Sequence, residues 1–184
     1  MGAEQLKVPA LPVLLPLGAV LMLLSWLWLR RRDRLTARRL LAAWALSWYA
    51  VAVLGATMLP MSLSWGPDAG SAETWRILLV PSLSTRRRDF VLNAMMTLPL
   101  AALLHLNFGV TDRLRVVRIG FLLSLGIETT QLMLILTLHG NRWADVNDLL
   151  SNTIGTILGY LGWWRLMRSA RVRNAVTEVP AGVR

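Results

Sequence analysis

Six polar side chains lie within 25 residues of an otherwise apolar part of the chain, and their chemical types could serve a binding or catalytic site. They are Glu128, Gln131, Arg142, Asp145, Asp148 and Asn152. Carboxylate and amide oxygens suit a divalent cation such as Mg²⁺ or Mn²⁺, and a guanidinium suits a phosphate group. Carboxylates can also act as general acids and bases. The cluster is therefore compatible with chemistry on a phosphate and with simple binding of a charged group.

The spacing of these residues predicts two polar helix faces, because residues three, four or seven positions apart share one face of a helix. The first face holds residues at i, i+4 and i+7: Ser124, Glu128 and Gln131. The second face holds residues at i, i+3, i+7, i+10 and i+14: Asp145, Asp148, Asn152, Gly155 and Gly159. Its lower part is a small-xxx-small pattern, which lets another helix approach closely.

The elements that carry the cluster are predicted to be membrane-spanning helices. Of the 184 residues, 55% are hydrophobic and only 16% are charged, and the mean hydropathy is +0.50. Five apolar windows are each near the ~20 residues that cross a bilayer. They cover residues 11–29, 40–59, 90–108, 119–138 and 146–166. Because backbone polar groups in hydrocarbon must be satisfied within the segment, we expect an all-α, multi-pass membrane bundle of about five transmembrane helices.

The distribution of basic residues predicts the orientation of this bundle. If the N-terminus is outside, fourteen of the twenty Lys and Arg residues fall on the cytoplasmic side, as the positive-inside rule requires. The expected topology is therefore N-out and C-in. Arg86, Arg87 and Arg88 fall on the outer side, where they serve either as headgroup anchors or as phosphate contacts in a site.

Three regions follow from this topology. Residues 1–39 hold the first helix and a basic cytoplasmic loop, residues 40–167 form the helical core, and residues 168–184 form a basic cytoplasmic tail. Within the core, an apolar stretch near residues 73–84 is too short to span and is expected to lie at the outer membrane interface.

The same topology gathers eight polar residues in the outer half of the membrane. They are Arg88, Asn93, Glu128, Gln131, Arg142, Asp145, Asp148 and Asn152. Polar groups at this depth must face the bundle interior or a water-filled cavity, so we predict a polar ligand-binding pocket there.

Structural roles compete with this interpretation for most of these residues. Asp145 and Asp148 begin a predicted helix, where a carboxylate caps unpaired N–H groups, and Asp148 could also pair with Arg142. Asn93 and Asn152 suit hydrogen bonds between helices. Glu128 fits a structural role least well, because a carboxyl group within the bilayer must be protonated or paired. Its expected partners are Arg142 and Gln131.

Composition excludes several classes of site. The chain has no cysteine, which excludes disulfides and iron–sulfur clusters. His105 and His139 are the two histidines, so a histidine-rich metal site is excluded, and His105 is expected to be structural. No cofactor is evident, although a divalent cation is compatible with the carboxylates. The net charge of +10 is assigned to loops that contact anionic lipid headgroups rather than to nucleic acid.

Four motifs in this chain resemble the VanZ-like family. They are Asn93-Ala-Met-Met-Thr-Leu-Pro-Leu, Ile127-Glu-Thr-Thr-Gln, Arg142-Trp-Ala-Asp-Val-Asn-Asp and Asn152-Thr-Ile-Gly-Thr-Ile-Leu-Gly. The resemblance spans about residues 40–166, and the polar spacings recur in the family's order. Two positions depart from the family pattern: Ala101 replaces a glycine after Pro99-Leu100, and Ser82 replaces an aromatic residue after Pro81.

The resemblance implies a bacterial plasma-membrane protein associated with tolerance of teicoplanin-type glycopeptide antibiotics. It implies no catalytic assignment, so whether the protein is an enzyme stays open. Three hypotheses remain: an outer-leaflet pocket that binds a lipid headgroup, a lipid-linked wall precursor or a lipoglycopeptide; an intramembrane enzyme that uses Glu128, Asp145 and Asp148 on a lipid-linked phosphate; and a purely structural membrane partner. A pocket in which the Glu128 and Asp148 carboxylates lie close together with room for an ion would favour the enzyme. A collapsed, fully hydrogen-bonded cluster without a cavity would favour the structural partner.

Overall fold

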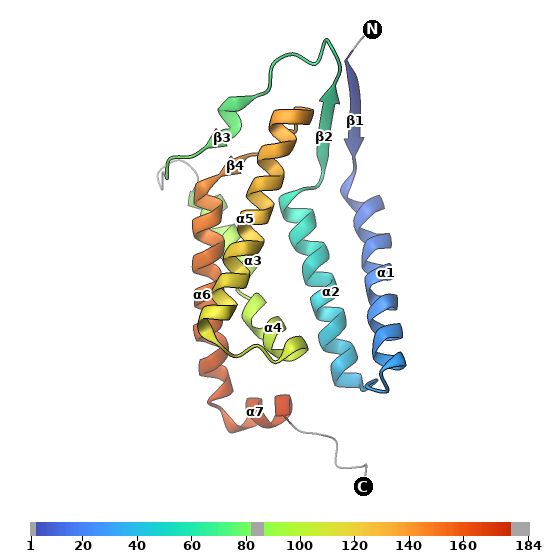
Figure 1. Ribbon diagram of the computed structural model, residues 1–184. Helices are drawn as coiled ribbons and strands as arrows, with labels where there is room; N and C mark the ends of the chain where they lie inside the picture. The colour runs from blue at the N-terminus through green and yellow to red at the C-terminus, as the bar shows by residue number, and fades with distance from the viewer. Residues whose placement is uncertain (1–2, 82–86, 178–184) are drawn as a thin grey trace.

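The computed structural model describes residues 3–81 and 87–177, and it is a bundle of helices with two small sheets at one end (Figure 1). The helices are α1 (Ala10–Arg31), α2 (Ala37–Thr57), α3 (Arg87–Thr97), α4 (Leu100–Phe108), α5 (Arg113–Leu138), α6 (Val146–Met167) and α7 (Ala170–Thr177). The sheets and a single 3-10 turn lie at the end opposite α7 (Figure 1). The expectation of an all-α membrane bundle is therefore confirmed, with sheets as a minor addition.

Within the described residues, four helical segments are long and apolar enough to cross a membrane. They are Ala10–Arg31, Ala37–Thr57, Arg87–Phe108 and Arg113–Leu138. The fifth predicted crossing forms α6, whose 22 residues would reach about 33 Å at 1.5 Å per residue, but its polar face makes it less apolar than the other four. The bundle is that of a membrane protein; five crossings and the N-out orientation stay predictions.

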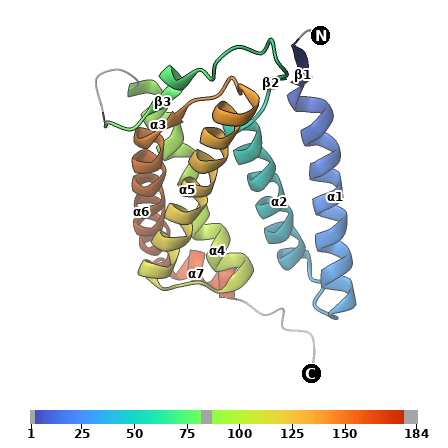
Figure 2. The ribbon, with the colours of Figure 1, turned by 45° about the horizontal axis from the view of Figure 1, so that its top comes forward.

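Helices α1 and α2 form an antiparallel pair at the edge of the bundle (Figure 2). The Thr36 side chain caps α2 by accepting a hydrogen bond from the Arg39 N–H, which satisfies one of the free donors at a helix start. Gly18 lies against the ring of Trp48, and Gly55 lies against Leu14. These small residues let the two helices pack closely.

The third predicted crossing, residues 90–108, is not one continuous helix. It consists of α3 and α4, which are separated at Leu98 and Pro99. Proline has no N–H to donate and its ring clashes with the preceding turn, so the helix breaks there. The α4 helix ends at Gly109, whose φ of 65° is a left-handed conformation that glycine adopts without steric cost. Ala101, in the first turn of α4, is buried in the core with Leu100, Leu104 and Val116.

Helix α6 lies beside α3 and α5 and contacts α4 (Figures 1 and 2). A Cβ atom added to Gly155 would fall well under 3.0 Å from the Ala94 carbonyl oxygen, and one added to Gly159 would do the same at the Leu98 carbonyl. The two glycines therefore allow α6 to touch the backbone of α3 and of the α3–α4 break, in agreement with the predicted small-residue contact.

Two short sheets cap one end of the bundle, and no pattern in the sequence predicted them. Strand β1 (Glu4–Val8) pairs antiparallel with β2 (Met61–Trp65). Strand β3 (Ile77–Leu78) pairs in parallel with β4 (Ala144–Asp145). The second pairing ties the long loop after α2 to the start of α6.

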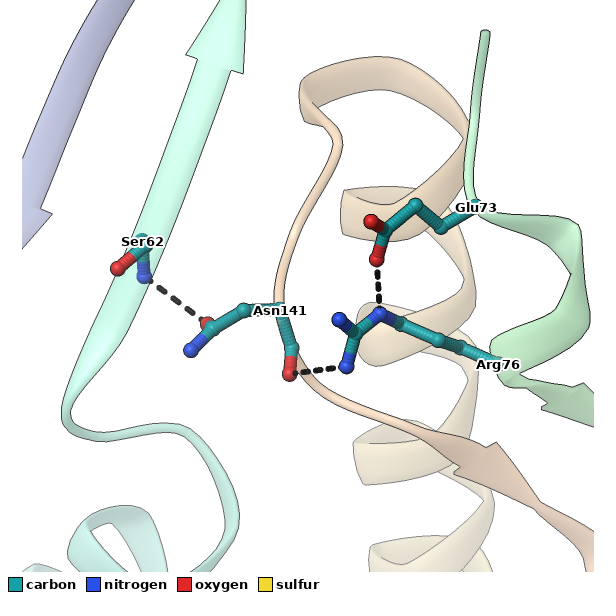
Figure 3. A network of polar contacts seen from close by, with 4 residues as sticks. All are labelled: Ser62, Glu73, Arg76 and Asn141. Atoms are coloured by element: carbon teal, nitrogen blue, oxygen red, sulfur yellow. Dashed lines mark hydrogen bonds and ion pairs between the residues drawn. The ribbon is translucent and has the colours of Figure 1, made fainter.

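A polar network strengthens this cap (Figure 3). The Ser62 N–H donates to the Asn141 side-chain oxygen at 2.9 Å, and Arg76 donates to the Asn141 carbonyl at 3.1 Å. Arg76 also forms an ion pair with Glu73. The guanidinium lies 4.4 Å from the ring centre of Trp75, a cation–π distance. The Arg76 side chain thus connects the loop after α2 to the loop after α5.

Part of the predicted interfacial stretch near residues 73–84 belongs to this cap. Thr74–Arg76 forms the 3-10 turn η1, and β3 follows it directly. The next two residues, Leu79 and Val80, are 75% and 78% exposed; the position of this segment at a membrane interface stays a prediction. Residues 82–84, and with them Ser82, lie outside the described residues, as do Arg86 and residues 178–184 of the predicted tail.

Candidate polar cavity

A cavity of about 500 Å³ lies between α2, α3, α5 and α6, at the capped end of the bundle. Its lining is polar for a site inside a membrane bundle. The lining residues are Ala56, Thr57, Asp89, Leu92, Asn93, Met96, Glu128, Gln131, Arg142, Trp143, Asp148 and Asn152. Six of the eight residues selected from the sequence are among them.

Helix α5 contributes Glu128 and Gln131, which lie one turn apart on the cavity side. Glu128 Oε2 accepts a hydrogen bond from the Asp145 backbone N–H at 2.8 Å. The expected pairing of Glu128 with Arg142 or Gln131 was therefore wrong. A backbone N–H held beside the carboxyl group by the β3–β4 pairing fills the place expected for a side chain.

Gln131 is 6% exposed and donates from Nε2 to the Thr57 carbonyl at 2.8 Å. A carbonyl can only accept, so this bond fixes which end of the amide is the donor. The other end, Oε1, is buried and has no hydrogen-bond partner within the described residues. Gln131 therefore joins α5 to the end of α2 and presents an unused acceptor.

Arg142 lies in the loop before β4 and lines the cavity. Its Nε donates to the Met58 carbonyl at 3.3 Å, and one terminal nitrogen donates to the Leu59 carbonyl. These carbonyls follow α2, where a helix leaves acceptors without partners. Burial lowers the pKa of the Arg142 guanidinium from its ordinary value, but an arginine remains charged at neutral pH. The charge is thus placed against the backbone carbonyls of the two residues that follow α2.

Asp145 caps α6, as the competing structural interpretation proposed. Its carboxylate accepts from the Asn147 backbone N–H and from the Asn147 side chain, both at 2.8 Å. The residue is 2% exposed and does not line the cavity. Asp148, in the first turn of α6, does line it.

Asn152 connects three helices and also faces the cavity. Its Nδ2 donates to Ser124 Oγ of α5 at 2.9 Å, and its backbone carbonyl accepts from Thr97 Oγ1 of α3 at 2.8 Å. The role of interhelical contact predicted for Asn152 is therefore present. The side chain is 1% exposed, and its Oδ1 has no partner within the described residues.

Helix α3 contributes a different face from the one expected. Asn93 lines the cavity as predicted, whereas Arg88 is exposed and is not among the lining residues. Asp89 and Met96 line it instead. Both share the helix face of Asn93 at i−4 and i+3, so helical spacing could have found them. No pattern in the sequence indicated Trp143, which lies in a loop.

Within the described residues, no group of three His, Asp or Glu side chains is arranged to hold a metal ion. The divalent cation suggested by the residue types stays a prediction.

These features define a class: a helical membrane protein with a polar cavity at one end of its bundle. A family model described as VanZ/LLP1 matches residues 46–168. The chain belongs to this family, and the resemblance seen in its four motifs is confirmed. No curated protein and no solved structure matches the chain.

Proposed function

We propose that this VanZ/LLP1-family protein binds the polar head of a membrane-resident molecule in the cavity, at the bacterial plasma membrane. The ligand is a lipid headgroup, a lipid-linked wall precursor or a lipoglycopeptide, and through it the protein acts in tolerance of teicoplanin-type antibiotics. The site opens among membrane-spanning helices, so the apolar part of such a ligand can remain in the lipid while the head enters the cavity.

One observation carries the proposal: two of the side chains that line the cavity, Gln131 and Asn152, each hold a buried amide oxygen without a hydrogen-bond partner among the described residues. A buried polar atom without a hydrogen bond costs about 1–3 kcal/mol. Two such atoms beside one cavity are expensive in a purely structural cluster, and a ligand with hydrogen-bonding groups offsets that cost. A collapsed cluster would have favoured the structural-partner hypothesis, whereas the cavity measures about 500 Å³.

The intramembrane enzyme is a second candidate, because Glu128 and Asp148 line the same cavity. A carboxyl pair beside a bound phosphate could serve as acid and base. Release of inorganic phosphate from a lipid-linked pyrophosphate by purified protein, lost in Asp148→Asn, would support it.

The binding proposal is tested with Glu128→Gln, which removes the carboxylate and keeps an oxygen able to accept from the Asp145 N–H. The control is Glu4→Gln, an exposed residue of β1 whose change alters the net charge equally. Protein released from membranes in a mild detergent is analysed by native mass spectrometry, and extracted ligands are identified. We expect wild type and Glu4→Gln to retain a bound molecule and Glu128→Gln to lose most of it. Equal retention in all three would reject the proposal.

A cellular measurement extends this test. Teicoplanin tolerance is compared in cells that express wild type, Glu4→Gln or Glu128→Gln at matched membrane levels. We expect tolerance to fall in Glu128→Gln alone. If Glu128→Gln loses the ligand but tolerance is unchanged, binding of that molecule is not the cause of the antibiotic tolerance.

A further inference from the structure

The chemistry of the cavity lining also indicates what kind of head it accepts. We propose that the ligand presents a primary ammonium group, as in an ethanolamine lipid or an amino sugar, and that this group is held by Glu128, Gln131 and Asn152. This inference rests on the proposed binding function and narrows its ligand class.

The buried atoms that lack a partner in the lining side chains are acceptors. Gln131 Oε1 and Asn152 Oδ1 have no partner in the part of the chain that the structure describes. Glu128 is hydrogen-bonded there through Oε2, which leaves its second carboxylate oxygen available. An ammonium group has three N–H donors and no acceptor, so its donors match the number and the kind of these unpaired oxygens.

Each of the two amide NH2 groups already donates one of its N–H groups inside the protein. Gln131 Nε2 donates to the Thr57 carbonyl, and Asn152 Nδ2 donates to Ser124 Oγ. The Thr57 hydroxyl donates to the Val53 carbonyl at 2.8 Å. A phosphate or carboxylate needs donors and would be repelled by the Glu128 carboxylate, whereas the unpartnered amide oxygens of Gln131 and Asn152 call for a donor.

The charges of the lining side chains also favour a cationic group on the ligand. Of the four ionisable side chains lining the cavity, three are acids, Asp89, Glu128 and Asp148, and one is a base, Arg142. Arg142 directs two of its nitrogens at the Met58 and Leu59 carbonyls. Arg142 belongs to the loop before β4, where its guanidinium suits the phosphate of a zwitterionic head whose ammonium group enters deeper. A cavity of this size is within the ~300–1,000 Å³ range of small-molecule sites.

Three lipids with the same short acyl chains separate the contributions of charge and hydrogen bonding. Phosphatidylethanolamine has a positive charge and three N–H donors. Phosphatidylcholine has the charge without N–H donors, and phosphatidylglycerol has hydroxyl donors without the positive charge. Ethanolamine and glucosamine without acyl chains then show whether the amine must come from a lipid.

The experiment measures thermal unfolding of delipidated, full-length protein in a neutral detergent, titrated with each compound. We expect phosphatidylethanolamine to raise the unfolding temperature at concentrations at least tenfold below those needed for the other two lipids. An equal response to ethanolamine or glucosamine would support the ammonium site and assign it to a soluble amine or a sugar. An equal response to phosphatidylcholine, or a preference for phosphatidylglycerol, would overturn the ammonium inference while leaving a lipid-binding function in place.

Two variants complete the design. Glu128→Gln keeps the acceptor for the Asp145 N–H and should lose the preference for phosphatidylethanolamine. Thr130→Val, on the exposed side of α5, should keep the preference and serves as the control. If no compound stabilises wild type and native mass spectrometry detects no bound molecule, the proposed function itself fails. If phosphatidylethanolamine stabilises Glu128→Gln as selectively as it stabilises wild type, the ammonium site is refuted but the lipid-binding function is not.

Discussion

A methyl group added to Gly155 tests whether α6 must touch the backbone of α3. The new Cβ would lie well under 3.0 Å from the Ala94 carbonyl oxygen and from Thr97 Oγ1, whereas ordinary contacts begin near 3.4 Å. The neighbouring atoms belong to a helix backbone and to a side chain that already bonds to the Asn152 carbonyl. The clash cannot be relieved by rotating a flexible side chain, so the helices must move apart.

The expected cost combines three contributions. Overpacking costs about 1–3 kcal/mol, and loss of the Thr97–Asn152 hydrogen bond adds about 0.6 kcal/mol, the average measured within a membrane. Replacing glycine by alanine in a helix recovers up to about 1 kcal/mol. Gly155→Ala should therefore lower the free energy of unfolding by about 1–3 kcal/mol.

The matched control is Gly162→Ala on the same helix, where an added Cβ meets nothing within 4 Å. It gains the same helix propensity without the clash, so it should be neutral or stabilising by up to about 1 kcal/mol. Unfolding of both variants and wild type is measured in detergent micelles against a denaturing detergent. Equal stability of Gly155→Ala and Gly162→Ala would refute the close contact between α6 and α3.

Two further predictions concern the loops. Arg142→Lys replaces a guanidinium that donates to two carbonyls after α2 by a single ammonium. We therefore expect the free energy of unfolding to fall by about 1–2 kcal/mol and proteolysis after Thr57 to become faster. Arg113→Lys at an exposed site is the control, and equal stability of the two variants would contradict a stabilising role of the two Arg142 hydrogen bonds. For orientation, the chain has no cysteine, so single cysteines report cleanly: Asp68→Cys in the exposed capping loop should react with an impermeant reagent on intact cells, and Arg34→Cys only after permeabilisation. The reverse labelling pattern would reject the N-out topology.

The positions of the helices could be predicted because the length of a run of consecutive apolar residues can be compared directly with the thickness of a bilayer. The windows at 11–29, 40–59 and 119–138 correspond to α1, α2 and α5. The break within the third window was harder to place. Pro99 marks it in the sequence, but a proline can either kink or end a membrane helix, and packing of α6 against the Leu98 carbonyl accompanies the break here.

The two strand pairings could not be predicted from local patterns. Strands β3 and β4 have two residues each, too few for an alternating pattern. Each pairing joins segments more than fifty residues apart in the sequence, so it exists only once the bundle has brought the loops together.

The candidate site, too, could be predicted only in part from the sequence. Helical spacing alone placed Glu128 with Gln131 and Asp148 with Asn152, because a helix turns by a constant angle per residue. Membrane physics then required both faces to point inward. The sequence by itself thus determined the helices, the polar faces and the small-residue stripe. Only the tertiary structure decided the partners: Glu128 bonds to a backbone N–H and Arg142 to backbone carbonyls, groups that every residue carries. A residue's type states which bonds it can make, whereas its position in the fold selects which of many identical backbone groups it meets.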